Sequence, residues 1–185
     1  MRNFALLILA LIALTSCDIF DLRDPQPPSE EAVWNDFATS WELTVQNLRL
    51  AYTDSRNTVN YSRIFADEYR FHFAPQDITD FSTDTFWERY QEQDMLLNLH
   101  SRYSKIELDL QSLEIDDEIS ADSAKIYRSY EMHLQPSAPE ENELVVSGNM
   151  ELQLRKEYGY WYITHWYDYR SVSDWTWGRL KHENS

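Results

Sequence analysis

The stretch that decides the fold is LVVSGNMELQLRKEYGYWYITHWYDYR, which covers residues 144–170. Its first half alternates apolar and polar side chains, which is typical of a β-strand with one buried face. The apolar set is Val146, Met150, Leu152 and Leu154, and the polar set is Ser147, Asn149, Glu151 and Gln153. A short turn, EYGY, separates this strand from a second one that is rich in aromatic residues. The stretch therefore predicts two neighbouring strands of an antiparallel sheet.

The second of these strands has large aromatic residues on both faces, which a strand with one solvated face does not need. Aligned with the strands before it, the set pointing toward the helices is Trp161, Ile163, His165 and Tyr167, and the outward set is Tyr162, Thr164, Trp166 and Asp168. Outward Tyr162 and Trp166, with Tyr127 from a neighbouring strand, would expose on the order of 400 Å², which is near the size of an interaction site. Two covers for this outer sheet face remain open, and they are not exclusive: a second subunit or other protein partner, and Trp175 and Trp177 of the C-terminal tail folding back over it.

Other strands and helices can be placed around this stretch. KIELDLQSLEI (105–115), SAKIYRSYEMHL (123–134) and EYRFHF (68–73) alternate like strands, whereas residues 61–65 and 84–100 have helical spacing. A helix is predicted to start at Ser29, because apolar residues then recur at steps of three and four: Trp34, Phe37, Trp41, Val45, Leu48 and Tyr52. Helices first and an antiparallel sheet afterwards predict an α+β fold, with the helices on one face of the sheet.

Residues 48–75, LRLAYTDSRNTVNYSRIFADEYRFHFAP, resemble the start of nuclear transport factor 2-like domains in bacterial exported proteins. The shared pattern is a helix that ends in Ala-Tyr, a further tyrosine, and Phe-Ala-Asp-Glu-Tyr leading into Phe-x-Phe. The resemblance implies a cone, in which a strongly curved, mostly antiparallel sheet wraps around N-terminal helices and leaves an apolar cavity. The superfamily includes isomerases, hydrolases, cyclases and non-catalytic binding or dimerising domains, so the fold leaves the function open.

The N-terminal segment MRNFALLILALIALTSC has the features of a bacterial lipoprotein signal. Its apolar run is too short to span a bilayer as a helix, and Leu14-Thr15-Ser16-Cys17 resembles a lipobox. The resemblance implies cleavage before Cys17 and acylation of this residue, which anchors the chain in a lipid bilayer on the extracytoplasmic side, periplasmic or surface-exposed. We therefore expect a signal peptide at residues 1–16, an acidic, proline-rich tether at 17–28, and one domain with a C-terminal tail at 29–185.

The formal net charge of −16 argues against one class of partner. A surface so rich in carboxylates repels the phosphates of DNA and RNA, so nucleic-acid binding is not expected. The five histidines lie far apart in the sequence, and there is no Gly-x-Ser-x-Gly motif. The sequence therefore gives no reason to assign a metal, a cofactor or a catalytic residue.

Two functions remain open for the domain. The favoured one is non-catalytic: the domain binds a protein, or holds a small apolar ligand in the cone cavity. The alternative is a cavity enzyme that performs general acid–base chemistry on a small apolar substrate, as ketosteroid isomerases do, with a carboxylate base and a tyrosine. The side chains predicted to line the pocket are Arg128, Tyr130 and His165. The carboxylates in the loop after the first strand are Asp77, Asp80 and Asp84.

Overall fold

The computed structural model describes residues 32–185, and the predicted signal peptide and tether lie outside this range. In chain order the elements are α2 (Trp41–Thr53), the 3-10 helix η2 (Ser55–Ile64), β1 (Phe65–His72), α3 (Pro75–Phe81), β2 (Phe86–Glu88), α4 (Arg89–Arg102), β3 (Tyr103–Ser112), β4 (Glu118–Ile119), β5 (Ser123–Pro136), β6 (Leu144–Glu157), β7 (Tyr160–Arg170) and α5 (Trp177–His182). None of the helices in this part of the chain has the length and apolarity needed to cross a membrane.

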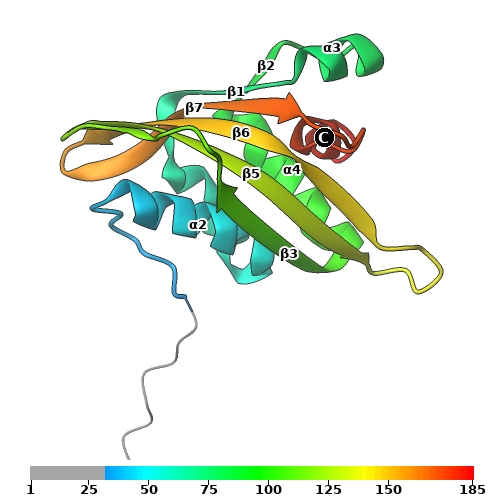
Figure 1. Ribbon diagram of the computed structural model, residues 1–185. Coiled ribbons are helices and arrows are strands. Elements are labelled where there is room, and N and C mark those ends of the chain that lie inside the picture. The colour runs from blue at the N-terminus through cyan, green and yellow to red at the C-terminus, as the bar shows by residue number, and fades with distance from the viewer. Residues whose placement is uncertain (1–31) are drawn as a thin grey trace, which may run out of the picture. The chain divides into compact units, whose positions relative to one another are not determined.

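The strands form one seven-stranded sheet in the order β2-β1-β7-β6-β5-β3, and the short β4 pairs with β5. All pairings are antiparallel except that of β1 with β7, which brings the first and last strands side by side. Strands as long as β5 and β6, with 14 residues each, accumulate twist and bend the sheet. Figure 1 shows the sheet curving over α2 and α4. The predicted α+β class, with a strongly curved sheet over N-terminal helices, is confirmed.

The core lies between the helices and the sheet face that they cover. Ile126 and Met132 on β5 and Leu152 on β6 are fully buried, as the alternation of these strands predicts. The helices contribute aromatic residues to the same core. Tyr52 of α2 and Tyr61 of η2 are fully buried, and their rings meet edge-to-face with centroids 5.7 Å apart. Much of the interior is therefore aromatic, with hydroxyl groups that need hydrogen-bond partners.

The first helix begins later than the sequence predicts. Ser29 lies outside the described residues, but residues 32–40 are not helical and α2 starts only at Trp41. The side chain of Asn47 accepts a hydrogen bond from the Asn35 N–H at 2.9 Å and donates one to the Asn35 carbonyl at 2.7 Å. These contacts hold the backbone of Asn35 against the side of α2, so it does not continue the helical axis.

The predicted helix over residues 84–100 is also shorter than its spacing suggests. Phe86 and Trp87 belong to β2, and α4 begins at Arg89. Glu88 and Gln91 form a capping box, in which the Gln91 side chain accepts a hydrogen bond from the Glu88 N–H at 2.9 Å. Because the box satisfies backbone groups that a helix leaves free at its first turn, it fixes the start of α4 at this point.

A bulge at Thr164 explains why β7 has aromatic residues at both parities. In the pairing of β7 with β6, Ile163 lies opposite Leu154 and His165 lies opposite Gln153, so Thr164 is an extra residue. An extra residue reverses the alternation of faces for the rest of the strand. The predicted orientations are therefore wrong after the bulge: Trp166 and Asp168 are buried, and His165 and Tyr167 are on the outer face.

Candidate functional site

The C-terminal helix α5 occupies the space where the resemblance implies a cavity. Thr176 caps the helix, since its hydroxyl accepts a hydrogen bond from the Arg179 N–H at 3.0 Å. Three side chains of α5 are fully buried: Trp177, Leu180 and Lys181. The Trp177 ring contacts the rings of three residues from α2, β5 and β7, with centroid distances of 5.0 Å to Tyr52, 4.9 Å to Tyr130 and 4.5 Å to Trp166. The interior is thus filled by the chain's own side chains.

Tyr130 and Asp168 form a buried pair beside the first turn of α5. The Tyr130 hydroxyl donates a hydrogen bond to Asp168 Oδ1 at 2.7 Å. The backbone of α5 also binds this pair, because the Trp177 N–H donates to the Tyr130 hydroxyl at 2.8 Å and the Gly178 N–H donates to Asp168 Oδ2 at 2.6 Å. Glycine is needed for this approach. A Cβ at position 178 would lie 3.1 Å from Asp168 Oδ2, and one at Gly148 would lie 2.4 Å from the Tyr130 hydroxyl.

A second carboxylate, that of Asp77 on α3, is buried near Asp168. It is held by the Arg170 guanidinium at 2.6 Å and by the Thr176 hydroxyl at 2.5 Å. The pKa of Asp168 is raised to about 7, mainly by burial and to a smaller extent by the negative charge of Asp77, and the hydrogen bonds that Asp168 accepts from Tyr130 and Gly178 act in the opposite direction. Carboxylates from α3 and β7 therefore hold the start of α5 from two sides.

Lys181 holds the other end of α5. Its Nζ lies 2.5 and 2.6 Å from the two carboxylate oxygens of Glu92 on α4. The hydroxyls of Tyr61 and Tyr69 each donate a hydrogen bond to the same carboxylate at 2.9 Å, and Nζ lies 3.8 Å from the centre of the Phe71 ring. Burial lowers the pKa of Lys181 to about 8, while the charge of Glu92 acts in the opposite direction. Removing one member of a buried ion pair strongly destabilises the folded protein, because the other charge is left buried without its partner.

A buried carboxylate beside a tyrosine is the pair that acid–base catalysis on a small substrate requires. Such a base must lie within hydrogen-bond reach of the proton that it removes. Here both side chains of the pair are buried, and both accept a hydrogen bond from the backbone N–H groups of Trp177 and Gly178. Residues 32–185 also bring no three metal-ligating side chains together. In this arrangement the pair of Tyr130 and Asp168 binds α5.

The structure does not bring the three predicted pocket residues together. Tyr130 points into the interior, as described above. Arg128 forms an ion pair with Asp117, in which two hydrogen bonds measure 2.7 Å each. His165 lies on the outer face because of the bulge at Thr164, and its ring stacks on that of His72 with centroids 5.6 Å apart. These side chains therefore do not surround a common space.

The two predicted interface residues have different surroundings. Trp166 is fully buried and packs against Trp177, so its predicted outward position is corrected. The tail does fold back onto the domain, and Trp177 is the residue that covers Trp166. Trp175 is partly buried, with the Arg179 guanidinium 3.8 Å from its ring centre. Tyr162, which precedes the bulge, is half-buried and lines a pocket that is described below.

Glu92 and Lys181 were not predicted as site residues, although the position of each on its helix indicates burial. Glu92 falls on the same helical face as the buried Leu96 and Leu99, at steps of four and seven residues. Lys181 is four residues after Trp177, which places it on the apolar side of a short helix. A charged residue on an apolar helix face needs a partner of opposite charge, and these two residues are partners.

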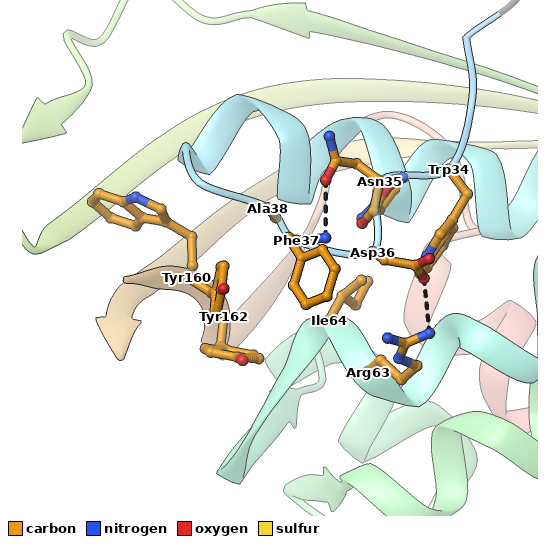
Figure 2. Close-up of a pocket in the computed structure, with 11 residues that line it drawn as sticks. Trp34, Asn35, Asp36, Phe37, Ala38, Arg63, Ile64, Tyr160 and Tyr162 are labelled. Atoms are coloured by element: carbon orange, nitrogen blue, oxygen red, sulfur yellow. Dashed lines mark hydrogen bonds and ion pairs between the residues drawn. The ribbon is translucent and has the colours of Figure 1, made fainter. Parts of the chain in front are cut away.

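A separate pocket of about 250 Å³ lies where the segment before α2 meets the start of β7 (Figure 2). Its aromatic lining consists of Trp34 and Phe37 from that segment and Tyr160, Trp161 and Tyr162 from β7. Its polar lining includes Asn35, Asp36 and Arg63. The hydrogen bond from the Trp161 N–H to the Ala38 carbonyl, at 2.8 Å, fastens the segment to the strand. The pocket is therefore built from parts of the chain that are distant in sequence.

No family model matches this sequence, and no curated protein matches it. Several solved structures are similar to it. A candidate scytalone dehydratase from Novosphingobium aromaticivorans has 13% identity and a TM-score of 0.57 over 75% of this chain and 91% of that chain. The Kfla4162 protein from Kribbella flavida has 10% identity and a TM-score of 0.57 over 75% and 92% of the two chains. The hexachlorocyclohexane dehydrochlorinase LinA-type3 from Novosphingobium barchaimii has 10% identity and a TM-score of 0.52 over 70% and 82%.

Identities this low show a common fold and leave the activity of this chain open. The structure is a strongly curved sheet that wraps N-terminal helices. Strands β1 and β7 are adjacent in it, and the sheet also contains the long strands β5 and β6. The domain of residues 32–185 has the nuclear transport factor 2-like fold.

Proposed function

We propose that this protein is a membrane-anchored, extracytoplasmic lipoprotein whose nuclear transport factor 2-like domain binds a partner or ligand and catalyses no reaction. The observation that carries the proposal is the closure of the interior by α5. Trp177, Leu180 and Lys181 fill the space beneath the sheet and have no exposed surface. A ligand there would have to displace the whole helix.

The hydrogen bonds of the interior support a structural role for its polar groups. Tyr130 donates to Asp168 and accepts from Trp177, so its hydroxyl has a donor and an acceptor within the chain. Glu92 accepts from Tyr61 and Tyr69 and is paired with Lys181. Buried polar groups with complete sets of partners are stable, and a substrate would gain little by replacing them.

The anchor is proposed from the sequence alone, since Cys17 lies outside the described residues. The lipobox-like LTSC and the short apolar run before it support acylation of Cys17. Two acyl chains, at about 0.8 kcal/mol per buried methylene, would hold the protein in a bilayer stably. The similar structures named above as a dehydratase and a dehydrochlorinase keep the enzyme alternative open, and it requires an interior that opens.

Amine labelling tests whether the interior opens. The full-length protein is treated at pH 8 with an amine-reactive ester, and the modification of its four lysines, Lys105, Lys125, Lys156 and Lys181, is followed by mass spectrometry. The pKa of Lys181, which burial lowers to about 8, leaves part of its amine unprotonated at this pH, so burial and the ion pair with Glu92 are what protect it. We expect Lys105 and Lys156 to react and Lys181 to react only after denaturation. Labelling of Lys181 in the folded protein at the rate of Lys156 would refute the proposal and favour the cavity enzyme.

A further inference from the structure

The pocket shown in Figure 2 has aromatic surface that the core of the domain does not use. Phe37 is 62% exposed, although the backbone beside it is fastened to β7. The rings of Phe37 and Tyr160 lie 5.4 Å apart and are inclined by 41°. Aromatic rings have negatively charged faces, which attract the polarised C–H groups of a flat, saturated ring. The accessible faces of Phe37 and Tyr160 can therefore stack on a ligand of that kind.

The pocket also has polar groups without partners among residues 32–185. The side chain of Asn35 accepts a hydrogen bond from the Phe37 N–H at 2.9 Å, and within this range its Nδ2 donates to no acceptor. The indole Nε1 of Trp34 is buried and has no acceptor among residues 32–185. A ligand in the pocket does not reach this atom, because the atom has almost no exposed surface. A purely apolar ligand would leave the Asn35 donor unpaired.

The charge of the pocket is balanced. Its two charged residues, Asp36 and Arg63, form an ion pair with each other at 2.9 Å. An anionic ligand would compete with Asp36 and meet a protein of net charge −16. A cationic ligand would have to compete with Arg63 for the single carboxylate. The charges therefore favour a neutral ligand.

A volume of about 250 Å³ is below the roughly 300–1,000 Å³ of pockets for drug-sized molecules, so the ligand is about one ring in size. A neutral ring with apolar C–H faces and many hydroxyl groups is a sugar. We propose that this pocket binds one pyranose ring of a neutral saccharide, an inference that rests on the proposed binding function and specifies its ligand. The ring stacks on Phe37 and Tyr160, and its hydroxyls bond to Asn35.

The pocket is preformed, as a binding site for a small ligand requires. Asn47 binds both the N–H and the carbonyl of Asn35, and the Thr44 hydroxyl donates to the Trp161 carbonyl at 3.0 Å. These hydrogen bonds connect α2 to both walls of the pocket. Little ordering is then needed on binding, which favours measurable affinity even for a single sugar ring.

Sugar binding can be measured through the indole signals of the seven tryptophans in the full-length protein. The protein is labelled with ¹⁵N-tryptophan and kept in a detergent without a sugar headgroup, and a Trp34→Phe variant assigns the Trp34 signal. The probes are glucose, N-acetylglucosamine, cellobiose and chitobiose, each titrated to about 50 mM, which covers the weak affinities expected for one ring. We expect at least one probe to shift the Trp34 signal with saturation.

Phe37→Ala should weaken that binding by about fivefold or more, the loss expected for one stacking ring. Tyr90→Ala is the matched control, because Tyr90 is also an exposed aromatic residue, at 68%, and does not line this pocket. Saturation by a monosaccharide would indicate a free sugar as the ligand, whereas binding of disaccharides only, with sedimentation on insoluble cellulose or chitin, would indicate the end of a glycan chain.

Two results would overturn the inference: no shift of the Trp34 signal with any probe, or equal affinity in Phe37→Ala and the unsubstituted protein. Tighter binding of cyclohexanol than of every sugar would also contradict it, since the hydroxyl-rich class would then be wrong. Failure of sugar binding while Lys181 stays protected from labelling would remove this inference alone. Labelling of Lys181 would instead remove the proposed function.

Discussion

Replacing Trp177 with alanine should show how much of the domain's stability comes from α5. The side chain is fully buried and touches the rings of Tyr52, Tyr130 and Trp166. The substitution removes the indole ring and its contacts with these three rings. The backbone N–H that binds Tyr130 is retained. Because truncation of a buried tryptophan to alanine costs roughly 3–5 kcal/mol, Trp177→Ala should remove a large part of a typical domain's stability.

Urea denaturation of the full-length protein, followed by circular dichroism, measures this loss. Trp175→Ala is the matched control, since Trp175 is two residues away, only partly buried, and stacked under Arg179 at 3.8 Å. A cation–π contact of this exposed kind contributes about 0.5–1 kcal/mol, so the control should lose about 1 kcal/mol. Added indole should restore part of the loss in Trp177→Ala, because a ligand at 100 times its dissociation constant contributes about 2.7 kcal/mol.

The reasoning would be refuted if the two tryptophan variants lost similar amounts, or if Trp177→Ala lost less than about 1 kcal/mol. Either result would mean that α5 does not fill the interior in solution. Restoration of both variants by indole to the same extent would show non-specific binding, and would likewise contradict a cavity shaped by the missing ring.

Three further outcomes are expected. Cys17→Ser should abolish incorporation of radiolabelled palmitate and release the protein from membranes; unchanged labelling would exclude acylation at this residue. The free energy of unfolding of Asp168→Asn, relative to that of the unsubstituted protein, should rise by up to about 4 kcal/mol between pH 4 and 7. The reason is that the folded unsubstituted protein keeps the Asp168 proton up to a pKa of about 7, whereas the unfolded chain loses it near 3.8, so the contribution of Asp168 to stability falls as pH rises. A difference between the two proteins that does not change with pH in urea melts would contradict this. Gly148→Ala should lower the free energy of unfolding in urea by roughly 1–3 kcal/mol, because its Cβ would collide with the Tyr130 hydroxyl. Gly159→Ala, with no atom within 4 Å, should lose only about 1 kcal/mol from the strain of its positive φ.

The sheet could be predicted from the sequence because its faces differ in burial. Along β5 and β6 each inward residue contacts the core and each outward residue contacts water, so the alternation is visible without a structure. The start of α2 could not be predicted, because apolar spacing continues through residues 34–37 and the competing bonds between Asn35 and Asn47 are tertiary. Local periodicity contains no information about such contacts.

The closed interior could be predicted only in part. A tail that folds back through Trp177 was one of the predicted alternatives, but it was expected over the outer face of the sheet and not inside it. Helix α5 has six residues, WGRLKH, three of them basic, so the sequence gives little indication that it is buried. Its burial depends on Glu92, 89 residues earlier, which neutralises Lys181. Only Tyr130 among the predicted pocket residues lies in this region, and its partner Asp168 was assigned to the opposite face because the bulge cannot be seen in the pattern.

The extra residue in β7 changes which sequence positions face the core, from odd-numbered positions before Thr164 to even-numbered positions after it. The Thr164 hydroxyl donates to the Gln153 carbonyl at 3.0 Å, which gives the looped-out residue a partner within the sheet. If Thr164 paired as an ordinary strand residue, Trp166 and Asp168 would face the solvent and His165 and Tyr167 would face the interior, although every letter of the chain stayed the same. Deletion of Thr164 would instead join two regular halves of β7 and leave each of these side chains on its present face. The bulge, and not the order of the residues alone, thus decides which aromatic side chains of β7 belong to the core.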